Sequence, residues 1–350
     1  MEKNIGVDLG YGFVKATDGK NDILFPSVVG QARNLRYVND EASEHNYINN
    51  MDVIVEGREY FVGDLANRQS DIVLFSLNEN RMDEGISKVL LVTSLSLLAN
   101  GRNTDYNIVT GLPVGFYTET KQTITQHFKG RHNITLRLNQ QTEQEKTLQV
   151  NEVKVLPQPF GSLFNLILDQ NGALIDENMA AAKIGIIDIG FRTTDYIVIH
   201  SLENIDRLSG SSNTALSTAY IMITEMLRDE FRITKPIYQL DEIVRQSVIR
   251  ISGKSYNLEE IKKHAFAMVA EKLVTEITGI WTNRWELDMV FITGGGGIAI
   301  ADYILPYFEN AMLVKDAQFA NVYGFRKLAQ RLYGDTKESV NPSLVVNSND

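Results

Sequence analysis

The 350-residue sequence contains no cysteine, which excludes a disulfide framework and a thiolate metal site. Its five histidines are scattered, and none has the His-Glu-x-x-His spacing of a catalytic zinc site. No apolar signal-peptide core follows the N-terminal Met-Glu-Lys-Asn, and the most apolar helical segment, residues 89–99, is too short to span a bilayer. These absences favour a cytoplasmic protein without a membrane partner.

Positive charge is also scarce. Lys and Arg number 34 against 44 Asp and Glu, which leaves a net charge of −10. Direct binding to nucleic acid usually needs a basic face, so we expect none here. The remaining composition, 43% hydrophobic and 22% charged, is typical of a globular protein, and 350 residues suit two domains better than one small core.

The N-terminal stretch Ile5-Gly-Val-Asp-Leu-Gly-Tyr-Gly-Phe-Val-Lys15 combines a carboxylate with a glycine turn. An apolar strand that carries Asp8 runs into Gly10 and Gly12, and a second apolar run ends at Lys15. Two short strands joined by Gly-x-Gly predict a β-hairpin, whose glycines let the backbone approach an anion closely and point several N–H donors at it. Asp8 would face a hydrated divalent cation and Lys15 a phosphate oxygen. Taken alone, the stretch is equally compatible with an ordinary hairpin that contains an incidental aspartate.

The same layout recurs in the second half of the chain. Ile186-Ile-Asp188-Ile-Gly190-Phe-Arg-Thr-Thr-Asp195-Tyr-Ile-Val-Ile199 again places an aspartate at the end of an apolar strand, followed by a turn and a second apolar strand. Asp188 lies 180 residues after Asp8, about half of the chain. This repeat predicts two similar α/β halves, each with a phosphate-binding turn. The two carboxylates would share one Mg²⁺ through its water molecules.

The segment Pro157-Gln-Pro-Phe-Gly161 interrupts the strand pattern and opens an apolar helix over 162–168, which predicts a first crossing between the halves. Asn321-Val-Tyr-Gly324 leads into the last helix and predicts the second crossing, and the polar residues 334–350 beyond it are predicted to form a flexible tail. Gln158 lies just before the first of these helices. It could orient a water near the phosphates, or it could cap the turn.

Two further positions are candidates for nucleotide contacts. Ser209-Gly210-Ser-Ser212 precedes a predicted helix, and the backbone of Gly210 could contact phosphate. Helices are also predicted over 240–251 and 258–281, the second with an apolar stripe that faces the core. Lys262 lies off this stripe, so it is either a solvated lysine or a contact to the base or ribose.

Met289-Val-Phe-Ile-Thr-Gly-Gly-Gly-Gly297 is a buried strand that runs into four glycines, with a helix predicted from 298 to 305. Glycines at this point remove side-chain bulk, so a flat ring can lie on the backbone. Gly294-x-Gly-x-x-Ala299 also matches a dinucleotide fingerprint, with Asp316 beyond it. Only about 50 residues follow the glycines, too few for the rest of that fold. The fingerprint would also leave the paired aspartate hairpins unexplained.

Together, the two aspartate hairpins, the glycine-rich strand and the two crossings resemble the actin/sugar-kinase/chaperone ATPase superfamily. Four motifs are most similar to prokaryotic actin-like proteins of the StbA/ParM plasmid-segregation type and to related archaeal actin-like proteins. The motifs are Gly10-Tyr-Gly-Phe-Val-Lys15, Phe25-Pro-Ser27, Gly111-Leu-Pro-Val114 and Asn321-Val-Tyr-Gly-Phe-Arg-Lys-Leu-Ala329.

The resemblance implies the actin-like ATPase fold of the α/β class, in which two similar α/β domains, each with a smaller subdomain, surround a nucleotide cleft. Residues 1–160 would form domain I, with an inserted subdomain near 31–80 and completion by a C-terminal helix, 321–333. Residues 161–320 would form domain II, with a subdomain near 230–262.

The same resemblance implies roles for individual residues. Asp8 and Asp188 would hold Mg²⁺ through water, and Lys15 would contact phosphate. Gln158 would orient the attacking water, and Asp188 and Asp195 are the other catalytic candidates, although Asp195 stands where actins have a histidine. Phe191-Arg192 replaces the small residues common in the second turn. Backbone groups implied to contact the phosphates belong to Gly10, Tyr11, Gly12, Gly190, Phe191, Arg192 and Thr193, and those implied to lie under the adenosine belong to Gly294, Gly295, Gly296 and Gly297.

The expected function is therefore that of an ATPase, with GTP as the alternative nucleotide and Mg²⁺ as the cofactor. Its partner would be the protein itself in a head-to-tail filament, with plasmid segregation through a DNA-bound adaptor as one role and another cytoskeletal task as the alternative. Two other functions fit the same fold. One is a small-molecule kinase that acts on a sugar or an acid, and the other is a scaffold that binds ATP without polymerising.

Overall fold

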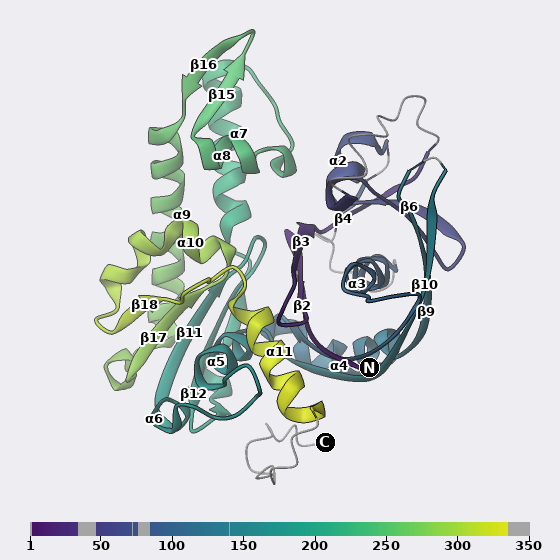
Figure 1. Ribbon diagram of the computed structural model, residues 1–350. Helices are drawn as coiled ribbons and strands as arrows, with labels where there is room; N and C mark the ends of the chain where they lie inside the picture. The colour runs from purple at the N-terminus through teal and green to yellow at the C-terminus, as the bar shows by residue number, and fades with distance from the viewer. Residues whose placement is uncertain (1, 34–46, 72, 76–84, 140, 335–350) are drawn as a thin grey trace. The chain divides into compact units, whose positions relative to one another are not determined.

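The structure is a computed structural model that describes residues 2–33, 47–71, 73–75, 85–139 and 141–334 (Figure 1). It divides the chain into two compact units, Met1–Glu177 with Phe319–Asp350, and Asn178–Gln318. The sequence placed the first boundary near residue 160, whereas the structure places it after Glu177. No helix among the described residues is both long enough and apolar enough to cross a bilayer.

In the first unit, ten strands of the described residues form one mixed sheet. The pairing is parallel between β1, β8 and β10 and antiparallel at the other junctions for which the register is known. In sheet order the strands are β3 (Asp22–Pro26), β2 (Phe13–Thr17), β1 (Lys3–Leu9), β8 (Asn103–Leu112), β10 (Glu143–Pro157), β9 (Gly130–Arg137), β5 (Met51–Val55), β6 (Arg58–Val62), β4 (Val28–Gln31) and β7 (Val73–Phe75). The helices are α2 (Asp64–Gln69), α3 (Ile86–Leu97), α4 (Val114–Phe128), α5 (Pro159–Ile167) and α11 (Ala320–Tyr333).

The region expected to form an inserted subdomain, 31–80, continues the main sheet through β5, β6, β4 and β7. The hairpin of β5 and β6 turns at Glu56 and Gly57, which have left-handed φ values of 49° and 79°. Parts of this region, and the expected tail at 335–350, lie outside the described residues.

Helix α3 forms the core of the first unit. Ten of its twelve residues are buried, and Figure 1 shows it enclosed by the curved sheet. A helix that is apolar on nearly all sides is stable only when it is buried on all sides. Its buried Ser94 and Ser96 donate hydrogen bonds to the carbonyls of Leu91 and Thr93, so no hydroxyl of this pair is left unsatisfied.

The C-terminal helix α11 docks on β1 and α5 through glycines. A Cβ added at Gly324 would lie 1.7 Å from the Gly161 carbonyl oxygen, and one added at Gly6 would lie 2.2 Å from the Val322 carbonyl oxygen. Asn321 strengthens the contact, because its Oδ1 accepts hydrogen bonds from the backbone N–H and the hydroxyl of Ser162. The backbones of α11, α5 and β1 therefore touch with no side chain between them, which explains why residues 161–177 group with the first unit.

In the second unit, six strands of the described residues form one sheet. A separate two-stranded hairpin stands apart from it. The sheet strands are β13 (Glu203–Asn204), β12 (Thr194–His200), β11 (Lys183–Ile189), β17 (Met289–Thr293) and β18 (Ala311–Leu313), with β14 (Gly210–Ser212) paired to β12. The hairpin is β15 (Val248–Ile251) with β16 (Lys254–Asn257), and the helices are α6 (Glu177–Ala181), α7 (Leu216–Phe231), α8 (Asp241–Gln246), α9 (Glu259–Ile280) and α10 (Gly295–Ile304).

The helix predicted over 240–251 is wrong in its second half. Helix α8 ends at Gln246, since Ser247 adopts a left-handed conformation with φ 53°. The β-branched residues Val248, Ile249 and Ile251 then form a strand, and Ser252 and the glycine after it make the left-handed turn of a hairpin. The apolar spacing of this short run suits a helix and a strand alike, and the turn residues decide between them.

The repeat seen in the sequence is also a repeat in strand register. Asp8 lies opposite Lys15 in the β1–β2 ladder, and Asp188 lies opposite Asp195 in the β11–β12 ladder, seven residues apart in each case. In each unit the aspartate strand also pairs in parallel with a strand that leads into a helix, β8 into α4 and β17 into α10. The two hairpins thus hold equivalent places in their sheets.

The glycine contact of α11 generates a test of stability. Gly324→Ala would force a Cβ into the backbone of α5, so we expect the first unit to lose at least about 3 kcal/mol of unfolding free energy. Gly279→Ala is the matched control, because Gly279 is an exposed glycine of α9 with no atom within 4 Å of the added Cβ. It should stabilise the protein by about 0.5–1 kcal/mol. Urea unfolding measures both variants. Equal changes in the unfolding free energy for Gly324→Ala and Gly279→Ala would contradict the packing described.

A cluster of charges on the first sheet makes the stability dependent on pH. Arg137 is paired with Asp52, Glu59 and Glu143. Asp52 Oδ1 is buried and accepts no hydrogen bond from the described residues. Burial, only partly opposed by Arg137, raises the pKa of Asp52 from 3.8 to about 6. The folded protein therefore binds this proton more tightly than the unfolded chain does. The stabilisation is complete below pH 3.8 and is lost as the pH rises through 6.

Replacing Asp52 with an amide should remove this dependence. The unfolding free energy of Asp52→Asn, relative to that of the parent protein, should be about 1–2 kcal/mol higher at about pH 7.5 than at about pH 4.5. Asp105→Asn, at an exposed aspartate of β8, should show no such change. Chemical unfolding of all three proteins at both pH values measures this difference. If the stability of Asp52→Asn relative to the parent protein is the same at both pH values, the prediction is contradicted.

Candidate functional site

The first hairpin holds Asp8 between two donors. This carboxylate is buried, with only 3% of the residue exposed. Lys15 Nζ lies 2.7 Å from its Oδ2, and Gln158 Nε2 donates to its Oδ1 over 3.0 Å. The three side chains come from β1, β2 and the β10–α5 junction, and they were all predicted as site residues. The structure of this unit brings them into one hydrogen-bonded group.

Gln158 was left with two possible roles, and it stands at the N-cap position of α5, where its carbonyl accepts a hydrogen bond from Gly161 N–H at 2.9 Å. Its side chain makes no cap hydrogen bond to α5 and reaches Asp8 instead. Its backbone N–H donates to the Leu112 carbonyl over 2.9 Å, and its Cγ lies so close to Gly111 that a Cβ there would approach it to 2.8 Å. An apolar cavity of about 70 Å³, lined in part by Tyr11 and Gln158, adjoins this point. The amide is thus positioned by its backbone and its packing.

Ser27 supports the first turn, although the sequence did not single it out as a site residue. Its hydroxyl donates to the Gly10 carbonyl over 2.5 Å, and its N–H donates to the Gly12 carbonyl over 3.0 Å. These two bonds hold the turn carbonyls to the start of β4. The motif Phe25-Pro-Ser27 was the available signal, since proline and serine are typical turn residues and serine hydroxyls hydrogen-bond the backbone.

The second hairpin differs from the first in charge. Asp188 and Asp195 are both buried, at 6% and 1% exposed, and they lie directly opposite each other in the ladder. Ser211 donates a hydrogen bond to Asp195. Two carboxylates therefore stand at the ladder position that Asp8 and Lys15 occupy in the first hairpin, where the pair has opposite charges.

Phe191 anchors the turn of the second hairpin, which explains why a large residue replaces the small ones usual there. Its ring packs edge-on against Tyr220 of α7 with 5.5 Å between centroids, and its carbonyl accepts a hydrogen bond from Ser217 N–H at 2.7 Å. Gly190 N–H closes the turn on the Thr193 carbonyl at 2.9 Å. Residues 190–193 are thereby tied to the first turn of α7.

The glycine run behaves differently from the expectation. Helix α10 begins at Gly295 and not near residue 298, so three of the glycines form its first turn. A Cβ at Gly294 would lie 2.3 Å from the Ile189 carbonyl oxygen and 2.4 Å from Asp188 Oδ1, and one at Gly296 would lie 2.8 Å from the Gly190 carbonyl oxygen. Two of the glycines are therefore required by the protein's own backbone. A Cβ at Gly297 would lie a tight 3.3 Å from Ile292 Cγ2, and only Gly295 leaves ordinary van der Waals space.

Two predicted contact residues have other partners in the structure. Gly210 packs against the ring of Tyr196, where a Cβ would lie 2.7 Å from the hydroxyl oxygen, so this glycine has a packing role. Lys262 Nζ donates to the Ser247 hydroxyl and lies 3.1 Å from Glu259 Oε2, beside the β15–β16 hairpin. It is about 21 Å along α9 from Glu276, which bonds the segment just before α7.

The carboxylates fit a magnesium ion that is shared with a ligand. Within the described part of the chain, no group of three or more His, Asp or Glu side chains is arranged to hold a metal ion. Mg²⁺ is usually bound by one or two carboxylates together with phosphates and water. Each unit by itself carries carboxylates of this kind, the buried Asp8 on the first hairpin and the buried Asp188 and Asp195 on the second. A metal cage built from protein side chains alone does not fit.

Comparisons with known proteins agree with this architecture. Residues 6–161 match the family model for the N-terminal domain of actin-like proteins, and residues 186–304 match the model for the C-terminal domain of archaeal MreB-like actin homologues. Each match contains one of the two hairpins. The chain belongs to the actin-like proteins. No curated protein matches the sequence.

Solved structures share the fold of this actin-like protein. The ParM of a 15-stranded filament from Clostridium botulinum is 26% identical with a TM-score of 0.79, and the alignment covers 95% of this chain and 100% of that one. The archaeal actin homologue Ta0583 is 19% identical with a TM-score of 0.78, over 93% and 99% of the two chains. Its complex with ADP aligns with a TM-score of 0.75 at 17% identity, over the same shares.

The close contact of Gly294 in this actin-like protein generates a second stability test. Gly294 has φ 85° and ψ 162°, a conformation that only glycine adopts readily, so Gly294→Ala should cost about 2–4 kcal/mol of unfolding free energy. Gly295→Ala, at the next residue, meets no atom closer than 3.7 Å and should change stability by less than about 1 kcal/mol. Denaturant unfolding monitored by circular dichroism separates the two, and a larger loss for Gly295→Ala would refute the contact.

Proposed function

We propose that this actin-like protein binds and hydrolyses Mg-ATP, and that the bound nucleotide controls its assembly with further copies into filaments. The observation that carries the proposal is the repeated hairpin. In both units a buried aspartate near the end of a strand lies opposite the residue seven positions later and beside a parallel strand that leads into a helix. Two sites of one design suit a ligand with several phosphates, which both hairpins would bind.

Binding would combine backbone donors with a few charged groups. The turns at 10–12 and 190–193 would donate backbone N–H groups to the phosphates, and Lys15 would add a positive charge. A hydrogen bond from an amide to a charged group is worth roughly 1.5–3 kcal/mol, so several of them give substantial affinity. Asp8 and Asp188 would hold Mg²⁺ through its water ligands. Bound Mg²⁺ would neutralise charge on the phosphates during cleavage.

Hydrolysis would depend on the position of Gln158. Its Nε2 already donates to Asp8, which directs the same amide so that its Oε1 can accept a hydrogen bond from the attacking water. Asp195, opposite Asp188, would add negative charge near the reacting groups and favour the cation there. The main contribution of these residues would be orientation and electrostatic stabilisation, as in other phosphoryl transfers.

Filament assembly is supported by the family. A head-to-tail contact between identical copies does not close on itself and extends into a filament. The Clostridium botulinum ParM is described as a 15-stranded filament, and the archaeal homologue Ta0583 has been solved with ADP. We place the filament of this protein in the cytoplasm, where a DNA-bound adaptor would connect it to a plasmid or another cargo.

Two other functions remain open to the same fold. A small-molecule kinase would turn over ATP only when a sugar or acid acceptor is present. A scaffold would bind ATP without hydrolysis-linked assembly. The opposed carboxylates of the second hairpin favour a cation-dependent hydrolase over a scaffold, since a binding module has no need for two buried acids facing each other.

Sedimentation with nucleotide tests the proposal. Mg-ATP should move the protein into the pellet, and ADP should give less pelleted protein or none. Asp188→Asn should lower ATP turnover at least tenfold, on the order of the loss caused by disturbing a metal site, and should keep the thermal unfolding temperature. Asp302→Asn, at an exposed aspartate of α10, should retain full turnover.

Parallel assays with GTP and with a panel of sugars separate the alternatives. Turnover that requires a sugar would identify a kinase, and nucleotide binding without pelleting would identify a scaffold. Unchanged turnover in Asp188→Asn would remove the assignment of this carboxylate to the metal.

A further inference from the structure

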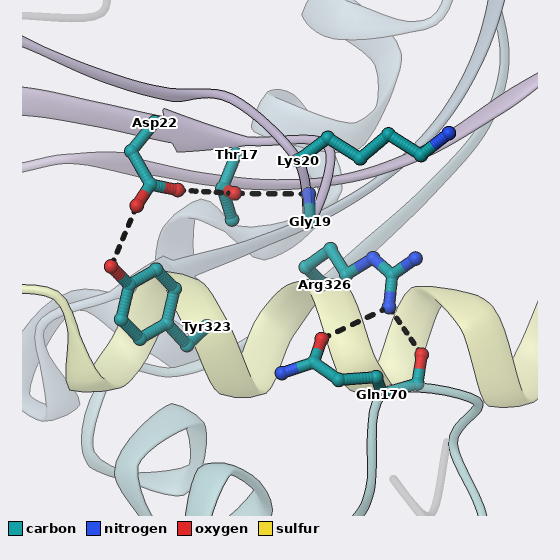
Figure 2. A pocket seen from close by; sticks show the side chains of 7 residues that line it. All are labelled: Thr17, Gly19, Lys20, Asp22, Gln170, Tyr323 and Arg326. Atoms are coloured by element: carbon teal, nitrogen blue, oxygen red, sulfur yellow. Dashed lines mark hydrogen bonds between the residues drawn. The ribbon is translucent and has the colours of Figure 1, made fainter.

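A second cavity, lined by polar side chains, lies within the first unit between the β2–β3 turn and α11. Its volume is about 200 Å³. Figure 2 shows Tyr323 and Arg326, three residues apart on one face of α11, directed toward the turn. The lining residues are Thr17, Gly19, Lys20, Asp22, Gln170, Tyr323 and Arg326.

The carboxylate of this cavity, Asp22, accepts its hydrogen bonds from neutral donors. Asp22 accepts hydrogen bonds from the Thr17 hydroxyl at 2.6 Å and from the Tyr323 hydroxyl at 2.7 Å, and Thr17 in turn accepts one from Gly19 N–H at 3.0 Å. No ion pair joins Asp22 to a cation in the described part of the chain. This carboxylate thus keeps its place without either cationic side chain of the cavity.

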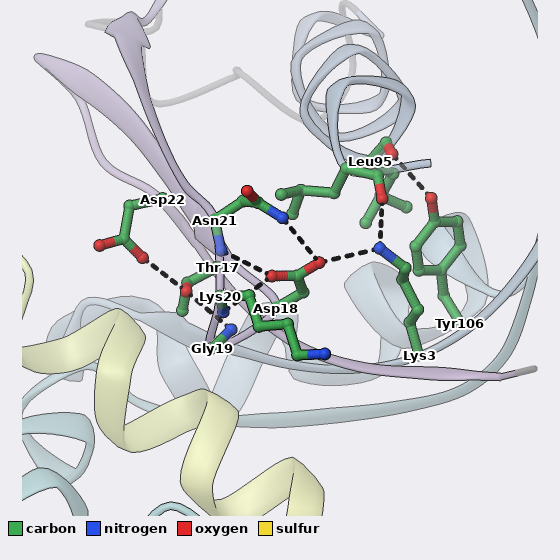
Figure 3. Close-up of polar contacts among 10 residues, drawn as sticks. Lys3, Thr17, Asp18, Gly19, Lys20, Asn21, Asp22, Leu95 and Tyr106 are labelled. Carbon is green, nitrogen blue, oxygen red and sulfur yellow. Dashed lines mark hydrogen bonds and ion pairs between the residues drawn. The ribbon is translucent and has the colours of Figure 1, made fainter. Parts of the chain in front are cut away.

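The neighbouring carboxylate, Asp18, is engaged elsewhere. It lies 2.8 Å from Lys3 Nζ and accepts hydrogen bonds from the backbone N–H groups of Asn21 and Lys20 (Figure 3). Burial alone would raise its pKa, but these donors outweigh burial and lower the pKa of Asp18 to about 2. Asp18 is therefore committed to Lys3 and to the turn backbone.

The cationic side chains of this cavity form no ion pair among the described residues. Arg326 Nη1 donates to the carbonyl and the side-chain oxygen of Gln170, and its Nε is buried without an acceptor among the described residues. Among those residues, neither Arg326 nor the exposed Lys20 forms an ion pair through its side chain. Burial lowers the pKa of Arg326, against the attraction of Asp18, yet a guanidinium stays protonated. A half-buried positive charge is thus held without a direct ion pair to a carboxylate of the described residues.

We infer that this cavity is an oxyanion-binding site, in which Arg326 and Lys20 bind one phosphate or carboxylate group. A guanidinium presents donors that match such groups, and charge-assisted hydrogen bonds are the strong ones. The volume is below the roughly 300–1,000 Å³ of pockets for drug-sized ligands, so the ligand is a small anion. The Asp22 carboxylate also lines the cavity and repels an anion, so an anion with several charges is disfavoured.

A bound anion would also strengthen the docking of α11. Lys20 belongs to the β2–β3 turn and Arg326 to α11, so an oxyanion held by both would join two elements that are distant in sequence. The site is separate from the hairpin group of Asp8 and does not depend on nucleotide hydrolysis. Phosphate should therefore raise the thermal unfolding temperature in the absence of nucleotide and Mg²⁺.

Titration of the ¹⁵N-glycine-labelled protein with sodium phosphate at constant ionic strength tests this inference. The amide resonance of Gly19 should shift and saturate in the parent protein. In Lys20→Gln the apparent affinity should fall about tenfold, the loss expected for one charge-assisted hydrogen bond. Arg326→Lys keeps the charge but not the planar donor group, so it should bind more weakly than the parent protein as well. Lys254→Gln, at an exposed lysine of β16, is the matched control and should bind as the parent does.

The resonances of Gly10 and Gly190 report on the hairpins in the same spectra, so phosphate bound there is distinguished from phosphate bound in the cavity. Repeating the titration with acetate shows whether the site prefers phosphate or carboxylate. The inference is overturned if the Gly19 resonance shows no saturable shift with either anion, or if Lys20→Gln binds with the affinity of the parent protein.

Discussion

The first unit depends on the direct backbone contact of α11 with α5 and β1. Glycine stands at each point of approach, at positions 6, 161 and 324, and any Cβ there would overlap a main-chain atom. The contact also reaches the candidate site. Gly6 precedes Asp8 by two residues in β1, and Gly161 follows Gln158 by three residues at the start of α5. The positions of the carboxylate and of the amide that bonds it are therefore set by a helix from the far end of the chain.

The two units use one hairpin design with different charge. In the first unit a lysine opposite the aspartate makes the pair nearly neutral, and Gln158 completes its hydrogen bonds. In the second unit a carboxylate stands opposite the aspartate, and a serine bonds it. Equivalent strand positions thus carry different charges, a lysine that could bind phosphate under the proposed function and a carboxylate that could attract a cation. The repeat explains the shared geometry, and the exchange of one residue explains the difference in chemistry.

Glycine contacts also position the start of α10 in the second unit. Gly294 and Gly296 let the start of α10 rest on the backbone at Ile189 and Gly190. Phe191, meanwhile, packs on Tyr220 and fastens the turn to α7. The turn is thereby fixed from two sides, which is the preorganisation that the proposed phosphate binding would require.

Much of this arrangement could be predicted from the sequence, and the failures have physical causes. The two hairpins were predictable because strand periodicity, glycine turns and the aspartates are all local signals. The helix expected over 240–251 was wrong, since a short apolar run is compatible with either period and left-handed turn residues decided the outcome. The glycines of 294–297 were identified, but the reason for two of them was not, because the atoms they must avoid belong to β11, about a hundred residues earlier.

The sequence by itself determined the repeated aspartate hairpins, the strand that precedes the glycine run and the acidic, cysteine-free character of the protein. These features depend only on neighbouring residues and on composition. The tertiary structure decided that Gln158 bonds Asp8, that α11 completes the first unit, and that Lys20 and Arg326 line one cavity. Each of these joins residues separated by 150 or more positions, or by most of the chain, and only packing can bring such residues together.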